Sequence, residues 1–282
     1  TSNSECIQNL LRQPHRLIKH ITRRLYARNS RQSVFPGDGI DWQSASAVLF
    51  LLGRHPQSDR QPGEPCLILN KRSLNVPQPG DLCCPGGRVS RRLDAGLAIL
   101  LKLPILNLAR WPYWPWWRKT RPHEAKWLRL LLATGVRESI EEMRLNPFGL
   151  KFLGPLPQQQ LIMFQKVIYP MVCWINRQKR FFPNCEVEKI VYIPLKDLLN
   201  PSLYARYRLN IKTSKDNENH PDIRDYPCFI QQSEHSTEIL WGATFRITMV
   251  FLEIIFGFKP PDMASLPVIN GSLREDYLTG SI

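Results

Sequence analysis

The sequence predicts an α/β or α+β fold in which a mixed β-sheet lies between helices. The chain has 282 residues, of which 43% are hydrophobic and 22% charged, so it carries enough apolar side chain for a sizeable core. Short apolar runs of strand length are mixed with a few longer runs whose apolar residues recur at helical spacing. The 24 prolines also predict frequent interruptions and long loops.

The first part of the chain is predicted to form a helix, two strands and a glycine bend. Residues 5–28 have the apolar spacing of an amphipathic helix, which Pro14 is expected to bend or split. ASAVLFLL (45–52) and CLILNKR (66–72) have the composition of strands. PQPGDLCCPGG (77–87) is predicted to be a turn, a short strand and a bend.

The second part repeats the alternation of helices and strands. Helices are predicted at 124–145 and 239–256, and strands at 161–175 and 187–195. Residues 212–225 are rich in Asp, Asn, Lys and His, so they are predicted to form a surface loop.

The excess positive charge is confined to two segments. Of the net charge of +14, residues 1–31 supply +6 and residues 88–136 supply +8, while the rest of the chain is neutral. Such localised charge predicts an anionic partner, namely a phosphate compound, nucleic acid or an acidic membrane surface. A solvated basic face is the alternative interpretation.

The cysteines and the N-terminus favour a cytoplasmic protein. The seven cysteines form no CxxC pair and no Cys/His metal spacing, which favours reduced core cysteines. The start of the chain lacks an apolar signal-peptide core, so secretion is not expected. The apolar run that starts near residue 95 contains Lys102 and Pro104 and is shorter than the ~20 residues that span a bilayer.

The strongest local signal is the acidic run RESIEE (137–142). Positions i, i+3 and i+4 share one face of a helix, so Glu138, Glu141 and Glu142 are expected to converge. Mg²⁺ or Mn²⁺ would neutralise their mutual repulsion, because both ions prefer oxygen ligands. Arg137 can pair with one carboxylate and fix its orientation. The alternative is an exposed acidic helix face with arginine salt bridges.

A glycine bend upstream changes the interpretation of this helix. Pro85-Gly86-Gly87-Arg88 follows a predicted strand, and its glycines allow a tight bend and a close backbone approach to a ligand. Together, PGG and RExxEE resemble the Nudix box of the Nudix hydrolases, whose pattern is G-x5-E-x7-R-E-U-x-E-E-x-G-U with U aliphatic. The positions that match are Gly87, Arg137, Glu138, Glu141, Glu142 and Leu145.

The chain departs from that pattern in spacing and at individual positions. The arginine usually stands 14 positions after the glycine, and here it stands 50 after it, an excess of 36. Asp94 lies one place beyond the position expected for the first acidic residue, Ser139 replaces an aliphatic residue and Arg144 a glycine. A longer loop before the helix is tolerable, because lengthening a loop costs little entropy.

Further segments resemble the coenzyme A diphosphatase-like Nudix proteins. They are LILNKRS (67–73), GDLCCPGG (80–87), EVEKIVYIPLKDLL (186–199) and ILWGATFRITMVFLEII (239–255). The resemblance therefore covers most of residues 45–256 in the expected order. Val76 and Pro77 occupy the stretch where that subfamily has an arginine, and Cys84 stands where phenylalanine is usual.

The resemblance implies a Nudix fold, a mixed sheet sandwiched between helices, and a set of site residues. Glu138 and Glu142 would be direct ligands of Mg²⁺ or Mn²⁺, Glu141 a further or water-bridged ligand, and Arg137 would hold a glutamate in place. Gly86, Gly87 and Arg72 would contact the substrate, with a surface arginine as the alternative for Arg72.

Four other residues have less direct roles in this interpretation. Glu186 or Glu188 would assist as a base or form a surface salt bridge. Trp241 and Arg246 are expected to be fold elements rather than catalytic residues.

The predicted organisation has three parts. A basic amphipathic segment (1–31) precedes a Nudix domain (40–260), which carries a basic, Trp-rich insertion at about 95–130, and a tail (261–282) follows. The insertion contains Trp111, Trp114, Trp116 and Trp117, followed by Arg118, Lys119 and Arg121. Three hypotheses fit it: a peripheral membrane anchor, a lid over the substrate, or a small core packed against Leu100, Leu101, Ile105 and Leu108.

The function predicted from the sequence is Mg²⁺- or Mn²⁺-dependent cleavage of a diphosphate linkage in a coenzyme A-like or other nucleoside-diphosphate conjugate. The alternatives are a catalytically silent Nudix-fold binding module and a protein that binds an anionic ligand or a membrane surface. Nucleic acid is not expected as a partner, because it would not explain the acidic helix face.

Overall fold

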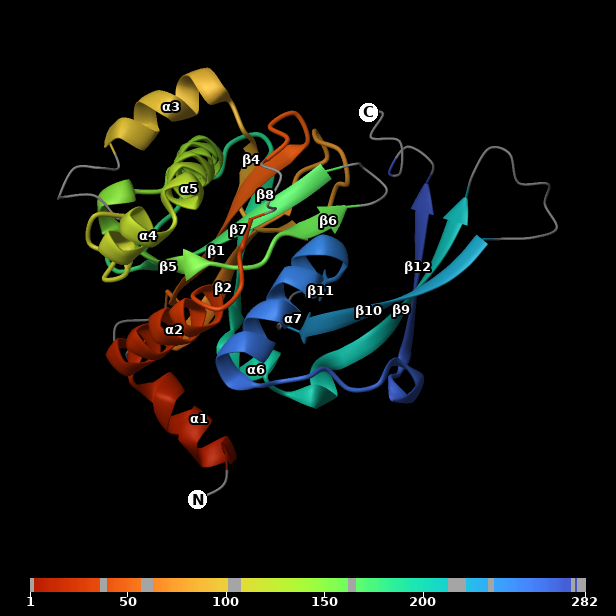
Figure 1. Ribbon diagram of the computed structural model, residues 1–282. Coiled ribbons are helices and arrows are strands. Elements are labelled where there is room, and N and C mark those ends of the chain that lie inside the picture. Colours follow the sequence, from red (N-terminus) through yellow and green to blue (C-terminus); the bar gives the residue numbers. More distant parts are fainter. Residues whose placement is uncertain are drawn as a thin grey trace.

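The computed structural model describes residues 3–35, 40–56, 63–100, 108–161, 166–212, 222–232, 236–274 and 277. The chain has a mixed α/β architecture, with two β-sheets and with helices on both faces of the larger sheet (Figure 1). The predicted fold class is therefore confirmed.

Two helices form the N-terminal segment, α1 (Asn3–Arg12) and α2 (Pro14–Asn29). The split predicted at Pro14 is confirmed, and this proline begins α2, where its missing N–H costs no helical hydrogen bond. Leu17, Ile21 and Leu25 are buried, so α2 packs one side on the protein core.

The main sheet has eight strands, and the β1–β7 pair is parallel while the others are antiparallel. The strands are β1 (Ala45–Arg54), β2 (Pro65–Arg72), β3 (Leu82–Cys83), β4 (Gly86–Arg88), β5 (Leu150–Pro155), β6 (Gln159–Leu161), β7 (Lys166–Ile175) and β8 (Val187–Pro194). Five of them follow the order β3-β2-β1-β7-β5. The single strand predicted at 161–175 is divided between β6 and β7, and residues 162–165 lie outside the described ones.

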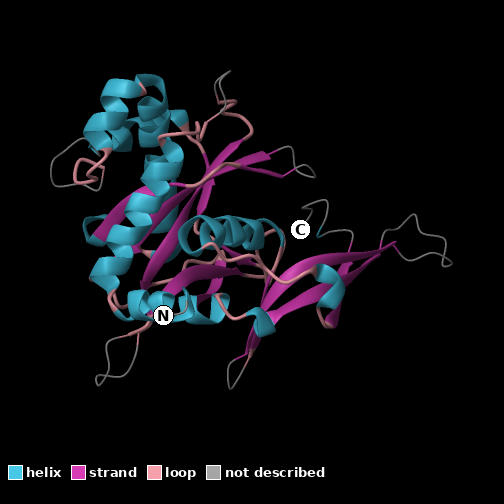
Figure 2. Ribbon diagram, turned by 60° about the horizontal axis from the view of Figure 1, so that its bottom comes forward, coloured by secondary structure: helices cyan, strands magenta, loops and turns pink. Residues whose placement is uncertain are grey.

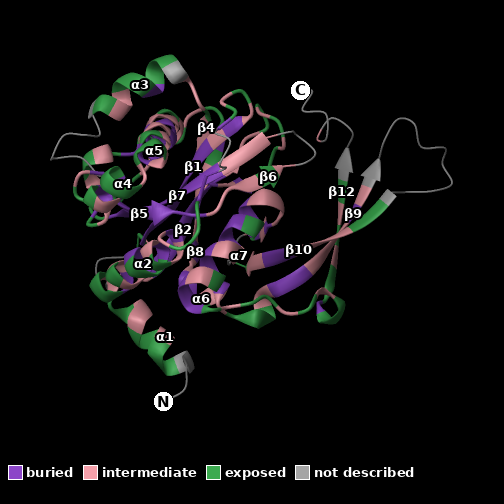
Figure 3. Cartoon of the chain, in the orientation of Figure 1, coloured by how far each residue is buried: buried purple, intermediate pink, exposed green. Residues whose placement is uncertain are grey.

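Strand β1 lies in the middle of the order β3-β2-β1-β7-β5. Helices cover both of its faces (Figure 3). Ala47 and Leu49 face α5 (Pro122–Met143), while Val48 and Phe50 belong to the core formed with α2 and α7 (Gly242–Phe256). The alternation of side chains along the strand explains this division. Gly135 allows α5 to approach closely, since a Cβ there would lie 2.7 Å from Leu49 Cδ2.

A second sheet of four strands extends from the main body (Figure 2). In sheet order these strands are β11 (Thr237–Leu240), β10 (Asp222–Gln232), β9 (Tyr204–Lys212) and β12 (Val268–Arg274). The predicted loop at 212–225 is therefore wrong at its ends, and the helix predicted from residue 239 starts only after β11. Part of the segment taken as a C-terminal tail forms β12, which pairs in parallel with β9.

Short helical elements connect the strands. They are α6 (Leu195–Leu198) and the 3₁₀ turns at Pro147–Gly149, Pro201–Leu203 and Met263–Ser265. Among the described residues, no helix has the length and apolar character needed to cross a membrane.

The insertion forms α3 (Arg91–Leu100) and α4 (Trp114–Thr120) and leads into α5. Trp111, Trp114 and Trp117 are buried in the core on the α5 side, and Trp111 Nε1 donates a hydrogen bond to the Leu153 carbonyl at 3.0 Å. These three tryptophans cannot be the predicted membrane anchor, because their rings already pack against the protein. They belong to the main core rather than to a separate one, and of their expected partners Leu101 and Ile105 lie outside the described residues.

Candidate active site

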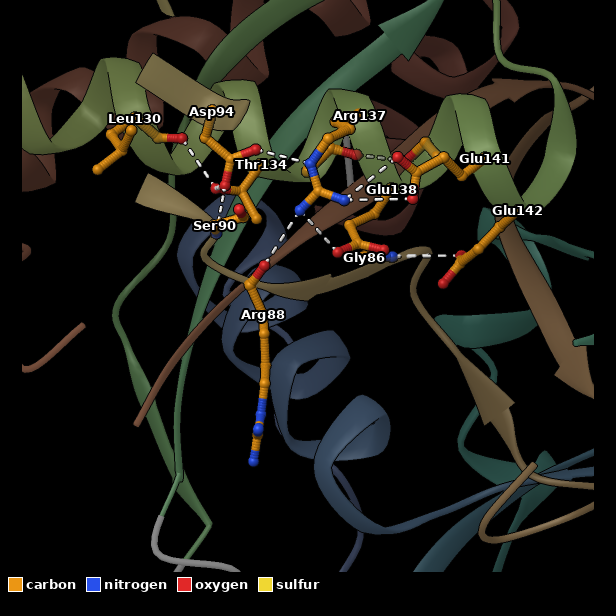
Figure 4. A network of polar contacts seen from close by, with 12 residues as sticks. Gly86, Arg88, Ser90, Asp94, Leu130, Thr134, Arg137, Glu138, Glu141 and Glu142 are labelled. Carbon is orange, nitrogen blue, oxygen red and sulfur yellow. Dashed lines mark hydrogen bonds and ion pairs between the residues drawn. The ribbon is translucent and has the colours of Figure 1, made fainter. Parts of the chain in front are cut away.

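Arg137 on α5 organises a network of carboxylates (Figure 4). Its Nε donates to Asp94 Oδ1 at 2.7 Å, and its Nη2 donates to Glu138 Oε1 at 2.9 Å and to the Arg88 carbonyl at 3.2 Å. Its Nη1 lies 3.2 Å from Glu141 Oε2. The guanidinium therefore links α5, the end of β4 and the start of α3.

Asp94 is the fully buried partner of this arginine. Besides Arg137 Nε, it accepts hydrogen bonds from the Ser90 backbone N–H and from Thr134 Oγ1, each at 2.7 Å. Three donors on one buried carboxylate offset its desolvation. Burial opposes the charge of Arg137, but the hydrogen bond to Asp94 and the charges of Glu138 and Asp94 raise the pKa of this guanidinium above its usual value.

The insertion has therefore not separated Asp94 from the acidic helix. The chain turns after β4 into α3, and α3 packs against α5 with Asp94 in its first turn. Of the residues between Asp94 and Arg137, those that the structure describes include the rest of α3, all of α4 and most of α5.

Glu142 lies at the opposite end of the acidic run and faces the glycine strand. Its Oε2 accepts a hydrogen bond from Asn70 Nδ2 at 2.8 Å and lies 3.3 Å from the Gly86 backbone N–H. Burial, followed by the negative charge of Glu138, raises the pKa of Glu142 to about 8. Burial also raises the pKa of Glu138, against the lowering effect of Arg137.

The two glycines of β4 permit close contacts, Gly87 with α5 and Gly86 with β1. A Cβ on Gly87 would lie between 2.5 and 2.9 Å from the carboxylate atoms of Glu138. Gly86 has φ +149°, and a Cβ there would lie 2.3 Å from the Ala47 carbonyl oxygen. Both positions therefore require glycine, which explains the PGG motif beside the acidic helix.

The chemistry of Glu138 and Glu142 fits a divalent cation. Their negative charges lie close together, and the pKa of Glu142 is raised by burial and by Glu138, which is the condition that a bound cation relieves. Glu141 differs from them, because its side chain is 55% exposed and is paired with Arg137. Within the part of the chain that the structure describes, no group of three or more His, Cys, Asp or Glu side chains is arranged to hold a metal ion.

A cavity of about 630 Å³ lies on the other side of β4 from these carboxylates. Gly86 and Gly87 line it, together with Arg72, Arg88 and Lys166. Arg72 Nε donates to the Pro77 carbonyl at 2.7 Å, so its side chain is anchored at the cavity wall. The structure thus brings the residue predicted as a phosphate contact next to two further cations.

Glu186 and Glu188 lie at the border of this region. The charge of Glu186 adds to burial and to Glu138 in raising the pKa of Glu142. Glu188 lies 3.4 Å from Lys71 Nζ in an ion pair, as expected for a surface salt bridge.

Trp241 and Arg246 combine structural contacts with positions at the cavity. Trp241 precedes α7 and donates its Nε1–H to Asp81 Oδ1 at 3.0 Å, while Arg246 Nη2 donates to the Gln160 carbonyl at 3.0 Å. Both side chains also line the cavity.

The sequence did not identify Asn70, Ser90, Thr134 or Lys166 as site residues. Asn70 belongs to the LILNKRS segment, but nothing in that segment indicates that its amide faces Glu142. Thr134 lies one turn before Arg137 on the same helix face, and this spacing is the one signal that could have identified it.

Comparisons with known proteins give distant similarities. No family model and no curated protein matches the sequence. A crystal structure of the Nudix hydrolase RenU from M. smegmatis is 14% identical and covers 58% of this chain and 80% of its own, with a TM-score of 0.34. A C. elegans Ap4A hydrolase in a binary complex is 14% identical, covering 55% of this chain and 83% of its own, with a TM-score of 0.33.

A third similar structure is the NUDIX domain of Shewanella oneidensis NrtR complexed with ADP ribose. It is 15% identical and covers 61% of this chain and 85% of its own, with a TM-score of 0.32. At these identities and TM-scores, the similarities do not by themselves assign a family.

Proposed function

We propose that this protein is a Nudix-type hydrolase that uses Mg²⁺ or Mn²⁺ to cleave a diphosphate linkage. The substrate would be a coenzyme A-like or other nucleoside-diphosphate conjugate. One observation carries the proposal: Arg137 links Asp94, Glu138 and Glu141 in a single network, while Glu142 faces the backbone of the glycine strand.

This arrangement supports an active site better than an exposed acidic face. An exposed face would leave the glutamates in water, whereas Glu142 and Glu138 are both buried enough for burial to raise their pKa values. Clustered, desolvated carboxylates are typical of functional sites. Positions 86 and 87 have no room for a side chain, because the Ala47 carbonyl and the Glu138 carboxylate lie there.

The residues divide the work of binding and positioning. Glu138 and Glu142 would hold the cation, with Glu141 as a further or water-bridged ligand, and Arg137 would fix the rotamers of Glu138 and Glu141. When bound, the cation would neutralise the diphosphate and polarise a water molecule for attack on phosphorus. Arg72 would attract the diphosphate from the cavity side of β4.

The first experiment measures hydrolysis of coenzyme A, acyl-CoA, ADP-ribose, NADH and dNTPs with Mg²⁺, Mn²⁺ or a chelator. Cleavage is expected only with a divalent cation. Glu142→Gln should lower kcat/KM by more than about 100-fold, beyond the range for residues that only support a metal ligand.

Glu253→Gln is the matched control, because Glu253 is exposed and lies near the C-terminal end of α7. It should cleave like the unaltered protein. Tight binding of a conjugate without any cleavage would contradict the hydrolase and favour a catalytically silent binding module.

A further inference from the structure

The cavity beside β4 lies between the two sheets and on the α7 face of the main sheet. Its walls come from β1, β4 and β7 on one side and from β10 and the first turns of α7 on the other. Figure 4 shows Arg88 pointing away from α5 and toward α7, on the side opposite Glu138. The cavity therefore lies across the glycine strand from the carboxylates.

One end of the cavity is strongly cationic. Arg72, Arg88 and Lys166 lie close enough that burial, followed by repulsion from Arg88 and Arg72, lowers the pKa of Lys166. The cavity lining includes one acidic residue, Asp81. Three cations beside the carboxylate site match the charge of a diphosphate.

The floor of the cavity is apolar. It is formed by buried side chains of both layers, namely Leu82, Cys84, Phe245 and Ile247, with Val48 and Ile168 beside them. At the rim, both carboxylate oxygens of Asp81 already accept hydrogen bonds, from Trp241 Nε1 and from the Tyr277 hydroxyl. These two bonds hold Asp81 at the rim.

The floor favours an apolar occupant over a polar one. A base or sugar buried against this floor would lose its hydrogen bonds to water, which is unfavourable without replacement partners. An apolar chain loses none, and it gains from leaving water.

We propose that the cavity binds an apolar chain esterified to the diphosphate, so that the substrate is an amphiphilic diphosphate ester. The diphosphate would lie at Arg72, Arg88 and Lys166 and reach the carboxylates at the edge of β4. This proposal rests on the proposed hydrolase function, whose site supplies the diphosphate end. It concerns the group on the cavity side, so the other substituent can still be a nucleoside.

The test compares binding of ethyl diphosphate and hexyl diphosphate to the full chain by calorimetry, with a chelator to prevent cleavage. Each added methylene should tighten binding by up to about fourfold, the value for complete burial of a methylene group. Ala243→Phe should remove this increase while leaving ethyl diphosphate binding unchanged, since Ala243 lines the cavity on the first turn of α7. Ala264→Phe, at an exposed site, is the matched control and should retain the increase.

Arg88→Gln provides a second variant that does not alter the floor. It should weaken both esters by the same factor, because both carry the same charged head. If Ala243→Phe does not fold, the comparison of ethyl and hexyl diphosphate on the unaltered protein still decides whether an apolar chain is bound.

Equal affinity for both esters, or no binding of either, would overturn the proposal. Tighter binding of ADP than of hexyl diphosphate, abolished by Ala243→Phe, would also overturn it and assign the cavity to a base. The hydrolase proposal is tested separately. Metal-dependent cleavage, with ester binding that does not depend on chain length, would retain the hydrolase and reject the apolar-chain proposal. Chain-length-dependent binding without cleavage would reject the hydrolase alone.

Discussion

At the scale of single residues, the site depends on how each carboxylate is partnered. Asp94 has three donors and is fully buried, Glu142 has an amide and a backbone N–H, and Glu141 remains more than half exposed. These three acidic residues, one on α3 and two on α5, thus have different environments. Their chemical roles should differ accordingly.

Asp94→Asn should disturb Arg137 without removing a proposed metal ligand. The amide retains the size of Asp94 but loses its charge, so the guanidinium loses its strongest partner. We expect hydrolysis to fall by roughly 10- to 100-fold, as for other residues that orient metal ligands. Steady-state kinetics over a range of Mg²⁺ concentrations would measure this.

Leu93→Asn is the control for that variant, because Leu93 is exposed on the same turn of α3. It should behave like the unaltered protein. Equal activity of Asp94→Asn and Leu93→Asn would remove Asp94 from the positioning network.

The pKa of Glu142 predicts how stability depends on pH in the absence of metal. Because burial and Glu138 raise it from 4.5 to about 8, the folded protein keeps a proton that the unfolded chain releases at lower pH. The resulting stability is complete below about pH 4.5 and decreases as the pH rises toward 8.

Urea unfolding between pH 5 and pH 8.5, with a chelator present, would measure this dependence. Glu142→Gln cannot titrate, so its free energy of unfolding should decrease less over the same range. An identical decrease in both proteins would show that other groups cause it.

At the scale of secondary-structure elements, the site is a contact between a strand and a helix. β4 supplies Gly87, and the Glu138 carboxylate of α5 occupies the space which a Cβ there would need. The space beside Gly86 is occupied by the backbone of β1 at Ala47 and Val48. The contact explains why a motif near residue 87 and a motif near residue 138 act together.

Gly87→Ala should therefore impair activity more than folding. The added methyl group would displace the Glu138 carboxylate or β4, and a shift of about 1 Å at a reacting centre can lower the rate by about 100-fold. Kinetics together with thermal unfolding would separate the two effects. Gly149→Ala is the control, because a Cβ there meets nothing within 4 Å.

Helix α4 is predicted to stabilise the fold rather than to bind membranes. Trp117 is fully buried and contacts Phe35 and Trp111, so Trp117→Ala should lower the free energy of unfolding by about 3–5 kcal/mol. Phe148→Ala, at a side chain that is 69% exposed, should change it little. Denaturant unfolding would measure both, and a loss below 1 kcal/mol for Trp117→Ala would contradict this role.

At the scale of the whole molecule, the second sheet completes the cavity and depends on the C-terminal segment. The whole of β12, from Val268 to Arg274, pairs with one edge of β9. A chain truncated after residue 260 would expose that edge, and exposed edges pair with other molecules.

The truncated chain is therefore expected to form concentration-dependent aggregates. Light scattering beside the full chain would detect them. A monomeric truncated chain with unchanged unfolding would show that β12 is dispensable.

Local patterns were sufficient for much of the fold. Apolar runs predicted β1, β2 and β8, the break at Pro14 separated α1 from α2, and helical spacing predicted α5 and most of α7. The strands β9 and β10 were not predicted, because polar residues at their ends resemble a loop until a partner strand satisfies their backbone. The buried position of Trp111, Trp114 and Trp117 could not be predicted, since composition does not distinguish a core from an interface.

The sequence by itself determined the mixed α/β class, the spacing that places Glu138, Glu141 and Glu142 along one helix, and the glycines that allow a tight bend before it. These properties are local, because they follow from helical periodicity and from the conformational range of glycine. Only the tertiary structure decided that Asp94 and Arg137 form a pair, that Asn70 contacts Glu142, and that an apolar cavity with a cationic end lies behind β4. Those contacts join residues far apart in the chain, and they exist because packing of α3, α5 and the two sheets brings them within hydrogen-bonding distance.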